Sequence, residues 1–254
     1  MKLAPFFATS VLLCVFVASF SLISPVSADA VLVPVGPQNT RKSIPEQTYI
    51  VWGEIRNDGD VPAGSIWITA QFSDYEGWPV TVGGGEPMLS VIHPGETSPF
   101  EIIYSGPEVE EIGDQTFLFE FSATDALPTG LEIVSHSSDT PGTVVGEVQN
   151  IGTEPTTQIT VAATFYTSGG VVVGTASSDP IPGPLNPGEN ATFSVTLEYS
   201  ELLPEVDNYA LYAQSEEYAV VPEFPIWTSM LLILVMFTAA AVISKTRLLK
   251  TPIH

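Results

Sequence analysis

The stretch VWGEIRNDGDVPAGSIWITAQF, Val51 to Phe72, decides the fold because a similar stretch, VVGEVQNIGTEPTTQITVAATF, begins at Val144. The two stretches and the residues after them share glycines, prolines, acids and apolar residues at one constant offset of 93 positions. A constant offset over this distance indicates two copies of one domain, with almost no insertions between the shared positions. The matched residues are Gly53, Glu54, Asn57, Gly59, Pro62, Ile66, Ala70, Phe72, Gly77, Pro94, Gly95, Glu96 and Phe100 in the first copy, and Gly146, Glu147, Asn150, Gly152, Pro155, Ile159, Ala163, Phe165, Gly170, Pro187, Gly188, Glu189 and Phe193 in the second.

Apolar and polar residues alternate within each copy with a period of two. Ile66, Ile68 and Ala70 fall on one side of an extended segment, and Trp67 and Thr69 fall on the other. This alternation predicts half-buried antiparallel strands, and the Asn-Asp-Gly, Gly-Gly-Gly and Pro-Gly sequences between the runs predict turns. Short strands with regular turns predict an all-β fold of two tandem antiparallel β-sandwiches.

The charge of the chain excludes nucleic acid as a partner. The sequence holds 29 acidic and 7 basic residues, which gives a net charge of -22. The acids all lie between Asp29 and Glu223, where the only bases are Arg41, Lys42 and Arg56. A surface this negative repels phosphate backbones.

The N-terminus has the features of a secretory signal peptide. A positively charged start precedes an apolar core from Ser10 to Leu22, and small residues follow. We expect a signal peptide over residues 1–28, cleaved after Ala28 or else after Ala30, with an uncleaved anchor as the alternative. The only cysteine, Cys14, lies in this segment. The mature chain would then have no disulfide, no thiol nucleophile and no thiolate metal site.

The C-terminal apolar run predicts one transmembrane helix over residues 226–244. Its 19 residues carry no charge, and at about 1.5 Å per residue they span about 28 Å, close to the hydrocarbon thickness of a bilayer. A basic tail follows at once, whereas acidic residues precede the run. Since basic residues stay on the cytoplasmic side, we expect a single-pass protein of the cell membrane with an extracellular body and a cytoplasmic tail.

These features divide the chain into six segments. We expect a signal peptide at 1–28, a first sandwich at 29–126, a second sandwich at 127–218, a linker at 219–225, a transmembrane helix at 226–244 and a tail at 245–254. The junction between the sandwiches is short, which gives the two domains limited freedom. Few residues separate the second domain from the span, so we expect this domain near the membrane and the first projecting outward.

The second copy resembles the FxLYD family and the related CARDB-type adhesion modules. The resemblance rests on V-x-G-x-V-x-N-x-G from Val144 to Gly152, A-x-F-Y from Ala163 to Tyr166, G-x-V-V-G from Gly170 to Gly174 and L-x-P-G-E-x-x-x-F from Leu185 to Phe193. The first copy departs from this pattern, with Ser73 in place of the tyrosine. The resemblance implies an immunoglobulin-like extracellular module, and it names no ligand because this fold serves many roles.

Pro222, Glu223, Phe224 and Pro225 directly precede the apolar run. Pro225 suits the first turn of a helix and Glu223 suits the positive end of the helix dipole, which explains the motif as a helix start. The order of motif, apolar span and basic tail also resembles the archaeal PEF-CTERM type of sorting signal. That resemblance implies an archaeosortase-like processing enzyme, which removes the span and leaves the protein lipid-attached at the cell surface. Both interpretations stay open.

No constellation of residues predicts an enzyme or a cofactor. His93 precedes a Pro-Gly turn and is replaced by Asn186 in the second copy, and His136 lies near the junction of the copies. Neither histidine has a neighbouring motif that pairs a base with a nucleophile, so we interpret both as surface residues. We therefore expect a non-enzymatic chain with no catalytic site and no cofactor.

Two loops carry weaker candidates. Asp58 and Asp60 are weak calcium candidates because calcium prefers clustered carboxylates. An Asn-x-Gly hairpin turn at Gly59 explains the same residues without a metal, so no metal site is predicted. Asn190 opens an Asn-Ala-Thr sequon after a Pro-Gly-Glu turn, which makes it the candidate glycosylation site.

The aromatic residues of the first copy bear on function. Trp52, Trp67, Tyr75 and Trp78 are candidates for an exposed cluster that binds a partner, or else for packing between strand faces. We expect a cell-surface protein that displays two β-sandwich modules for adhesion, envelope assembly or partner binding. The alternative is a docking or accessory subunit of a transporter or of an extracellular enzyme complex. The expected partners are the membrane, the processing enzyme and a surface protein or glycan.

Overall fold

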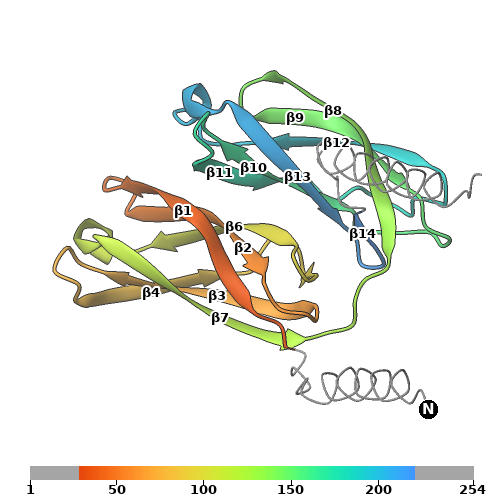
Figure 1. Cartoon of the computed structure of the whole chain (residues 1–254). Coiled ribbons are helices and arrows are strands. Elements are labelled where there is room, and N and C mark those ends of the chain that lie inside the picture. Colours follow the sequence, from red (N-terminus) through yellow and green to blue (C-terminus); the bar gives the residue numbers. More distant parts are fainter. Residues whose placement is uncertain (1–28, 221–254) are drawn as a thin grey trace, which may run out of the picture.

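The computed structural model describes residues 29–220, which form an all-β structure (Figure 1). The predicted signal peptide and its cleavage site, the Pro222–Pro225 motif, the transmembrane helix and the tail lie outside the described residues. Within residues 29–220, no helix is long and apolar enough to cross a membrane. The strands are β1 (Leu32–Ser43), β2 (Thr48–Asn57), β3 (Ala63–Ser73), β4 (Pro79–Gly85), β5 (Val91–Ile92), β6 (Thr97–Ser105), β7 (Asp114–Ala123), β8 (Thr129–Thr140), β9 (Thr143–Asn150), β10 (Thr160–Tyr166), β11 (Val172–Ser177), β12 (Asn190–Thr196), β13 (Asn208–Gln214) and β14 (Ala219–Val220), and the 3₁₀ helices are η1 (Pro107–Glu111) and η2 (Leu203–Glu205).

The first half of the described chain, which we call domain 1, contains two sheets. One has the strand order β1-β2-β6, and the other has the order β4-β3-β5 with β7 also paired to β3. Ile55 and Phe100 from the first sheet meet Ile68, Ala70 and Phe72 from the second in one buried core. These two layers around a single apolar core are the arrangement expected of a β-sandwich.

The alternation predicted from the sequence is confirmed in β3. Ile66 and Ile68 are buried, whereas Trp67 between them is 45% exposed. The period of two therefore sends one side of the strand into the core and the other side outward.

The second half, domain 2, forms one sheet with the order β11-β10-β13-β14-β8-β9-β12. Val161 and Phe165 from β10 share a buried core with Val148 from β9 and Phe193 from β12. The sheet must therefore fold over on itself, so that its two ends face each other as layers. The short strand β14 joins these layers, because it pairs antiparallel with β13 and parallel with β8.

The repeated asparagine lies at a corner between the layers and not in a hairpin, so the predicted hairpin turn is wrong. In domain 1, β2 pairs with β1 and β6, whereas the next strand, β3, belongs to the other sheet. The amide of Asn57 is buried and donates to the carbonyls of Val61 and Ile92 at 2.8 and 2.9 Å. Asn150 is equally buried and donates to Glu154 and Leu185, both at 2.8 Å. Each asparagine thus binds two loops together, because a buried amide must find partners.

A glycine and a phenylalanine that recur in both copies pack against each other in both domains. Gly53 stands opposite Phe100 in the register, and a Cβ on this glycine would lie 2.7 Å from the Phe100 ring. Gly146 stands opposite Phe193 in domain 2, where the equivalent distance is 2.6 Å. Each ring therefore covers a glycine, and no larger residue fits beneath it.

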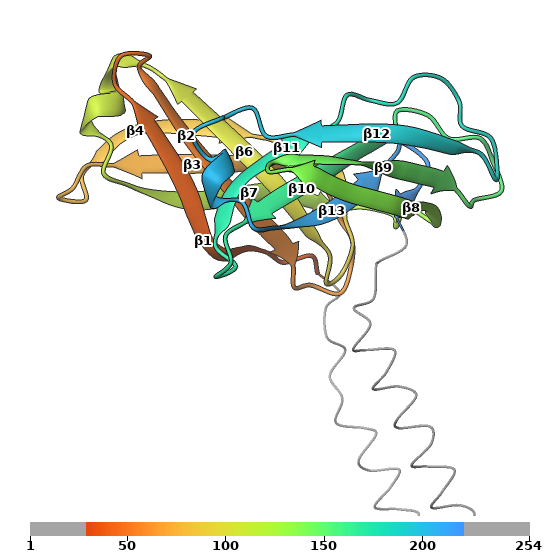
Figure 2. The same cartoon turned by 90° about the horizontal axis from the view of Figure 1, so that it is seen from above.

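The two domains pack side by side through their sheets (Figure 2). Side chains of β2 meet side chains of β10 and β13 across the boundary. Both ends of the described chain lie on one side of the molecule, because Asp29 accepts a hydrogen bond at the Asn57 corner and Val220 lines a cavity with His93. The expectation that domain 2 lies near the membrane and domain 1 projects outward involves residues beyond Val220, so it stays a prediction. Strand β14 also contains two residues, 219 and 220, that the sequence suggested for the linker.

Candidate functional site

The boundary between the domains is built around one buried carboxylate. Glu54 on β2 is 4% exposed. Its Oε1 atom accepts hydrogen bonds from the hydroxyls of Thr164, Tyr166 and Tyr212 at 2.8, 2.6 and 2.8 Å. All three donors belong to domain 2, so the acid of one domain is satisfied entirely by hydroxyls of the other. This arrangement gives the buried charge the partners that it needs.

The same contact changes the acidity of the two tyrosines. Burial, together with the neighbouring Glu54 carboxylate, raises the pKa of Tyr166 and of Tyr212 well above the ordinary value near 10.0. Loss of either proton would place a second negative charge beside the carboxylate. Both hydroxyls therefore stay protonated at physiological pH and can donate to Glu54.

An apolar cluster lies beside the carboxylate. Trp52 is fully buried, and its ring lies edge-on to Tyr199 with ring centroids 5.1 Å apart. Its Nε1 atom donates to Glu101 at 2.8 Å, and burial raises the pKa of this acid. Ile50 and Val172 complete the cluster from opposite domains. Of the four aromatic residues predicted as a cluster, Trp52 thus packs between strand faces.

Polar contacts fix the edges of the boundary. The side-chain oxygen of Gln214 accepts hydrogen bonds from the backbone N–H and from the hydroxyl of Ser90. The side-chain nitrogen of Gln214 donates to the Val91 carbonyl at 2.7 Å. On another edge, Arg41 pairs with Glu201 at 2.6 Å. Because these contacts surround the Glu54 carboxylate on several sides, they hold the two domains in one arrangement.

The outer sheet of domain 1 carries exposed apolar residues on the face that points away from domain 2. We call this surface, made by β3, β4 and β7, the outer face. Trp67 is 45% exposed, Leu118 53% and Val82 60%. The Trp67 indole lies over Gly84 of the neighbouring strand, where an added Cβ would meet its Nε1 at 2.9 Å. Polar Thr69 and Gln71 lie among them, since they share the outward side of β3.

The turn between β3 and β4 adds two more aromatics at one end of the outer face. Tyr75 is 81% exposed and Trp78 is 69% exposed. Asp74 shapes the turn, because its Oδ1 accepts the backbone N–H groups of Glu76 and Trp78 at 2.9 and 2.8 Å. The predicted aromatic cluster is therefore spread over a sheet face and a turn, without Trp52.

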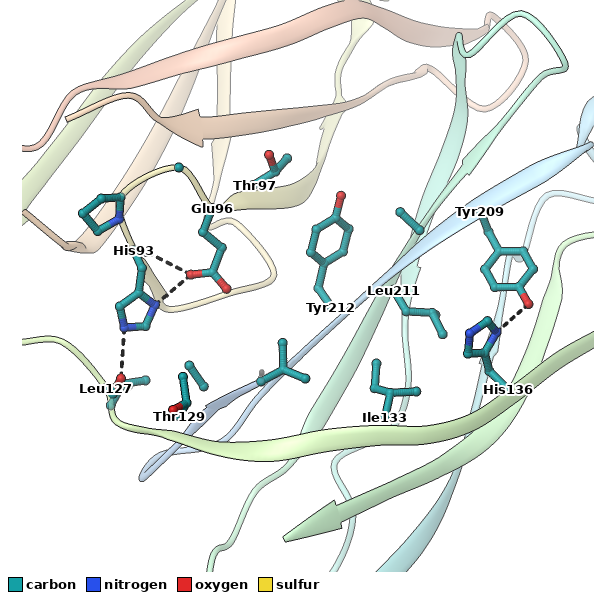
Figure 3. Close-up of a pocket in the computed structure, with 15 residues that line it drawn as sticks. His93, Glu96, Thr97, Leu127, Thr129, Ile133, His136, Tyr209, Leu211 and Tyr212 are labelled. Atoms are coloured by element: carbon teal, nitrogen blue, oxygen red, sulfur yellow. Dashed lines mark hydrogen bonds and ion pairs between the residues drawn. The ribbon is translucent and has the colours of Figure 1, made fainter. Parts of the chain in front are cut away.

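The two histidines lie at opposite ends of a groove between the domains (Figure 3). The His93 side chain is only 22% exposed. Its Nδ1 lies 2.8 Å from the Glu96 carboxylate, and its Nε2 lies 3.1 Å from the Leu127 carbonyl. His93 is therefore only partly exposed, because its side chain links a turn of domain 1 to the interdomain connection. His136 is exposed, and its Nδ1 lies 2.8 Å from the Tyr209 hydroxyl.

The groove encloses about 760 Å³ and has a mainly apolar middle. Leu211 and Tyr212 of β13 form one wall, and Ile133 of β8 forms another. Figure 3 shows Tyr212 with its hydroxyl directed away from these apolar side chains. Val220, the last described residue, also lines the groove.

The two calcium candidates bind other groups. Asp58 pairs with Arg56, which lowers the pKa of this acid, and Asp60 accepts the backbone N–H of Asp29 at 2.8 Å. Over residues 29–220, no group of three or more His, Cys, Asp or Glu is placed to hold a metal ion. The candidate glycosylation residue, Asn190, is exposed at the start of β12 and lies 3.2 Å from Glu147.

The sequence did not reveal the Glu54 site, although Glu54 belongs to the repeat. Its repeat counterpart, Glu147, is half-buried and has no such cluster of hydroxyls among its described contacts. The sequence did contain one signal of this site, on the outward side of β10. Thr164 and Tyr166 are next neighbours on that side, which a single sandwich would expose to water.

Comparisons with known proteins do not assign the chain to a family. No protein-family model matches the sequence, and no curated protein matches it. Among solved structures, the chain has partial similarity to the exo-chitosanase CsxA of Amycolatopsis orientalis, with 12% identity and a TM-score of 0.26 over 74% of this chain and 26% of that one. A β-glucuronidase from glycoside hydrolase family 2 gives 13% identity and a TM-score of 0.22 over 69% of this chain and 23% of that one. The chain spans about a quarter of the length of these enzymes, and similarity this low assigns no activity.

Proposed function

We propose that this chain is a non-enzymatic cell-surface protein in which two immunoglobulin-like β-sandwiches form one rigid unit for binding a partner. The observation that carries the proposal is the outer face of domain 1, where Trp67, Val82 and Leu118 are exposed on one side of a sheet. Exposed aromatic and apolar residues on a rigid scaffold are the usual anchors of a binding surface.

The interface supports this role because it holds the outer face in a fixed orientation. Glu54 and its three hydroxyl donors lie on the opposite side of domain 1 from the outer face. Domain 2 is therefore a support that leaves the binding surface free. The partner class that fits is a surface protein or glycan without strong negative charge, since the chain carries a net charge of -22.

The location of the protein is part of the same proposal. A signal peptide at residues 1–28 and a C-terminal apolar span place both domains outside the cell. The span is either kept as an anchor or removed by an archaeosortase-like enzyme at the Pro222–Pro225 motif. Mass spectrometry of the mature protein separates these two routes, because only a retained anchor keeps the peptides that follow Pro225.

Binding to isolated envelope fractions tests the proposal. The full-length chain, purified in detergent and labelled with a fluorophore, should bind these fractions saturably. The double variant Trp67→Ala/Trp78→Ala should bind at least about tenfold more weakly, because truncated aromatic anchors typically cost 2 kcal/mol or more, roughly a factor of thirty. The matched control is Val171→Ala, since Val171 is the repeat counterpart of Trp78 and is also exposed.

Two results would contradict the proposal. Equal binding by the wild-type chain and the double variant would remove the outer face as the site. Turnover of peptides, glycans or esters that is lost on changing a single residue would overturn the non-enzymatic role. A transporter or enzyme subunit that co-purifies stoichiometrically, and is lost in the double variant, would favour the accessory role instead.

A further inference from the structure

One pair of side chains on the outer face stands where domain 2 makes a contact between the domains. Trp67 of β3 lies opposite Glu120 of β7 in the strand register. At the corresponding place in domain 2, Thr160 of β10 lies opposite Gln214 of β13. Gln214 binds domain 1, because its side chain forms hydrogen bonds with residues 90–91. The Trp67–Glu120 pair therefore occupies a position that the other copy of this domain already uses to bind protein.

The backbone shapes this position in the same way in both domains. Ser65 and Gln158 are repeat counterparts, 93 residues apart, and both have a positive φ, 51° and 52°. This conformation is uncommon for residues other than glycine. In domain 1 it falls where the pairing of β3 with β7 shifts register, between Gly64 and Trp67. Such an irregularity re-aims the side chains beside it, so the placement of Trp67 is a built feature of the strand.

The chemistry of the position differs between the domains. The Gln214 amide both accepts and donates, which suits the backbone N–H and C=O groups that it binds. The Glu120 carboxylate can only accept, and it is charged. An aromatic ring, Trp67, stands beside it in place of Thr160. A partner at this position must therefore supply hydrogen-bond donors, and a positively charged donor group suits both the acid and the ring.

The described part of the chain does not supply that cation. The three basic residues within 29–220 are engaged elsewhere, Arg41 with Glu201, Lys42 with the carbonyls of Glu110 and Ile112, and Arg56 with Asp58. Strands β3, β4 and β7, which form the outer face, contain two acids and no base. The charge of this surface therefore complements a basic partner.

The chain holds one of its own arginines with the same combination of groups. The Cζ of Arg41 lies 5.3 Å from the centre of the Tyr199 ring, and its Nε lies 2.6 Å from the Glu201 carboxylate. Both partners belong to domain 2, so this contact joins the domains. A planar guanidinium can lie on a ring and pair with an acid at once, whereas an ammonium has no flat surface to present. Trp67 and Glu120 offer the same combination to a partner.

We propose that the outer face binds an arginine of a partner protein, whose side chain lies across the Trp67 indole and whose guanidinium pairs with the Glu120 carboxylate. The indole leans over Gly84 of β4, whereas Glu120 stands on β7. An arginine suits this spacing, because its apolar stem covers the ring while its charged head reaches the acid. Exposed Leu118 and Val82 lie on the same face for apolar contacts around it. This site rests on the proposed function and names the chemical group that the outer face recognises.

Charge-matched variants test the site with the labelled full-length chain and isolated envelope fractions. Glu120→Gln should bind at least about fivefold more weakly, because a charge-assisted hydrogen bond contributes more than a neutral one. Glu132→Gln is the matched control, since Glu132 is also exposed on a strand but lies opposite Gln149 and not opposite a ring. It removes the same charge and should bind within about twofold of the wild-type chain. Trp67→Leu keeps an apolar side chain without the ring and should also bind at least about fivefold more weakly.

Modification of the envelope fractions identifies the group that binds. Phenylglyoxal, which blocks guanidinium groups, should reduce binding of the wild-type chain to the level of Glu120→Gln. Acetylation of lysines should leave binding within about twofold, because lysine does not replace arginine at a stacked site.

Three results would overturn this site and still leave the outer face as a binding surface. Glu120→Gln could bind like the wild-type chain while Trp67→Ala/Trp78→Ala binds weakly. Equal losses in Glu120→Gln and Glu132→Gln would show only general attraction between opposite charges. Full binding after phenylglyoxal treatment would identify a partner group other than arginine, such as a lysine or a neutral glycan. Wild-type binding by the double variant is a separate outcome, which removes the outer face itself.

Discussion

Removal of the Glu54 carboxylate should separate the domains, whereas the same change at Glu147 should not. The two residues hold one repeat position, 93 residues apart, so they differ mainly in what surrounds them. Glu54 is 4% exposed and accepts three hydroxyl donors from domain 2. Glu147 is half-buried on domain 2, where it accepts a hydrogen bond of 3.2 Å from Asn190.

The size of the effect follows from what Glu54→Ala leaves behind. Three hydroxyls lose their acceptor inside the interface, and each unsatisfied donor costs about 1–3 kcal/mol unless water reaches it. With water reaching part of the site, we expect a total cost of about 3–5 kcal/mol for the three hydroxyls. For a protein of this size, each kcal/mol lowers the Tm by about 2–4 °C, so we expect a fall of about 6–20 °C.

Calorimetry of the full-length chain in detergent measures this difference. Glu147→Ala should shift the Tm by no more than about 2 °C, since surface substitutions usually change stability by less than about 0.5 kcal/mol. Glu54→Gln should fall between wild type and Glu54→Ala, because its carbonyl oxygen still accepts from two hydroxyls. Equal Tm values for Glu54→Ala and Glu147→Ala would refute the account of the interface.

Two other perturbations address the same architecture. The contribution of Tyr166 and Tyr212 to stability should be constant up to about pH 10 and then fall by about 1.4 kcal/mol per pH unit for each residue, because a pKa raised in the folded state contributes stability that is lost as the pH rises. Urea unfolding above about pH 10 should show a smaller slope in Tyr212→Phe. Asn57→Asp and Asn150→Asp should each destabilise the chain by about 2 kcal/mol or more, because a carboxylate cannot donate to the two loop carbonyls. Urea midpoints equal to that of the wild-type chain would refute this role of the two asparagines.

The strands could be predicted from the sequence because their signal is local. In β3, Ile66 and Ile68 alternate with Trp67, and burial follows this pattern. The repeat offset also matched Gly53 and Phe100 to Gly146 and Phe193, and the structure pairs the glycine with the phenylalanine in both domains. These features depend only on neighbours within one domain, and a single period of two expresses them.

The corner at Asn57 could not be predicted, because its sequence is equally typical of a hairpin. Asn-x-Gly marks a change of direction, and both a hairpin and a crossing between sheets need one. What distinguishes them is the burial of the asparagine amide against Val61 and Ile92. Ile92 lies far along the chain, so no local pattern contains this contact.

The interface was hidden for a related reason. Trp52 and Glu54 occupy the side of β2 that a single sandwich turns toward water, and a pattern for one domain assigns them to the surface. They are buried only because domain 2 presents Thr164, Tyr166 and Tyr212 to them. Pairing between domains is a property of two surfaces, and the alternation within either strand contains no information about it.

The repeat also shows how the outer face differs from the face that domain 2 presents to Glu54. Domain 1 has its own version of the face that domain 2 uses to bind Glu54, and this version is the outer face. By repeat offset and strand register, Gln71 and Ser73 replace Thr164 and Tyr166, and Leu118 replaces Tyr212. A carboxylate such as Glu147 of another copy would meet a leucine there in place of a hydroxyl, at the cost of an unsatisfied charge. The outer face therefore lacks the set of hydroxyl donors that would bind the carboxylate of another sandwich. Its exposed Trp67 and Leu118 suit a partner of a different kind.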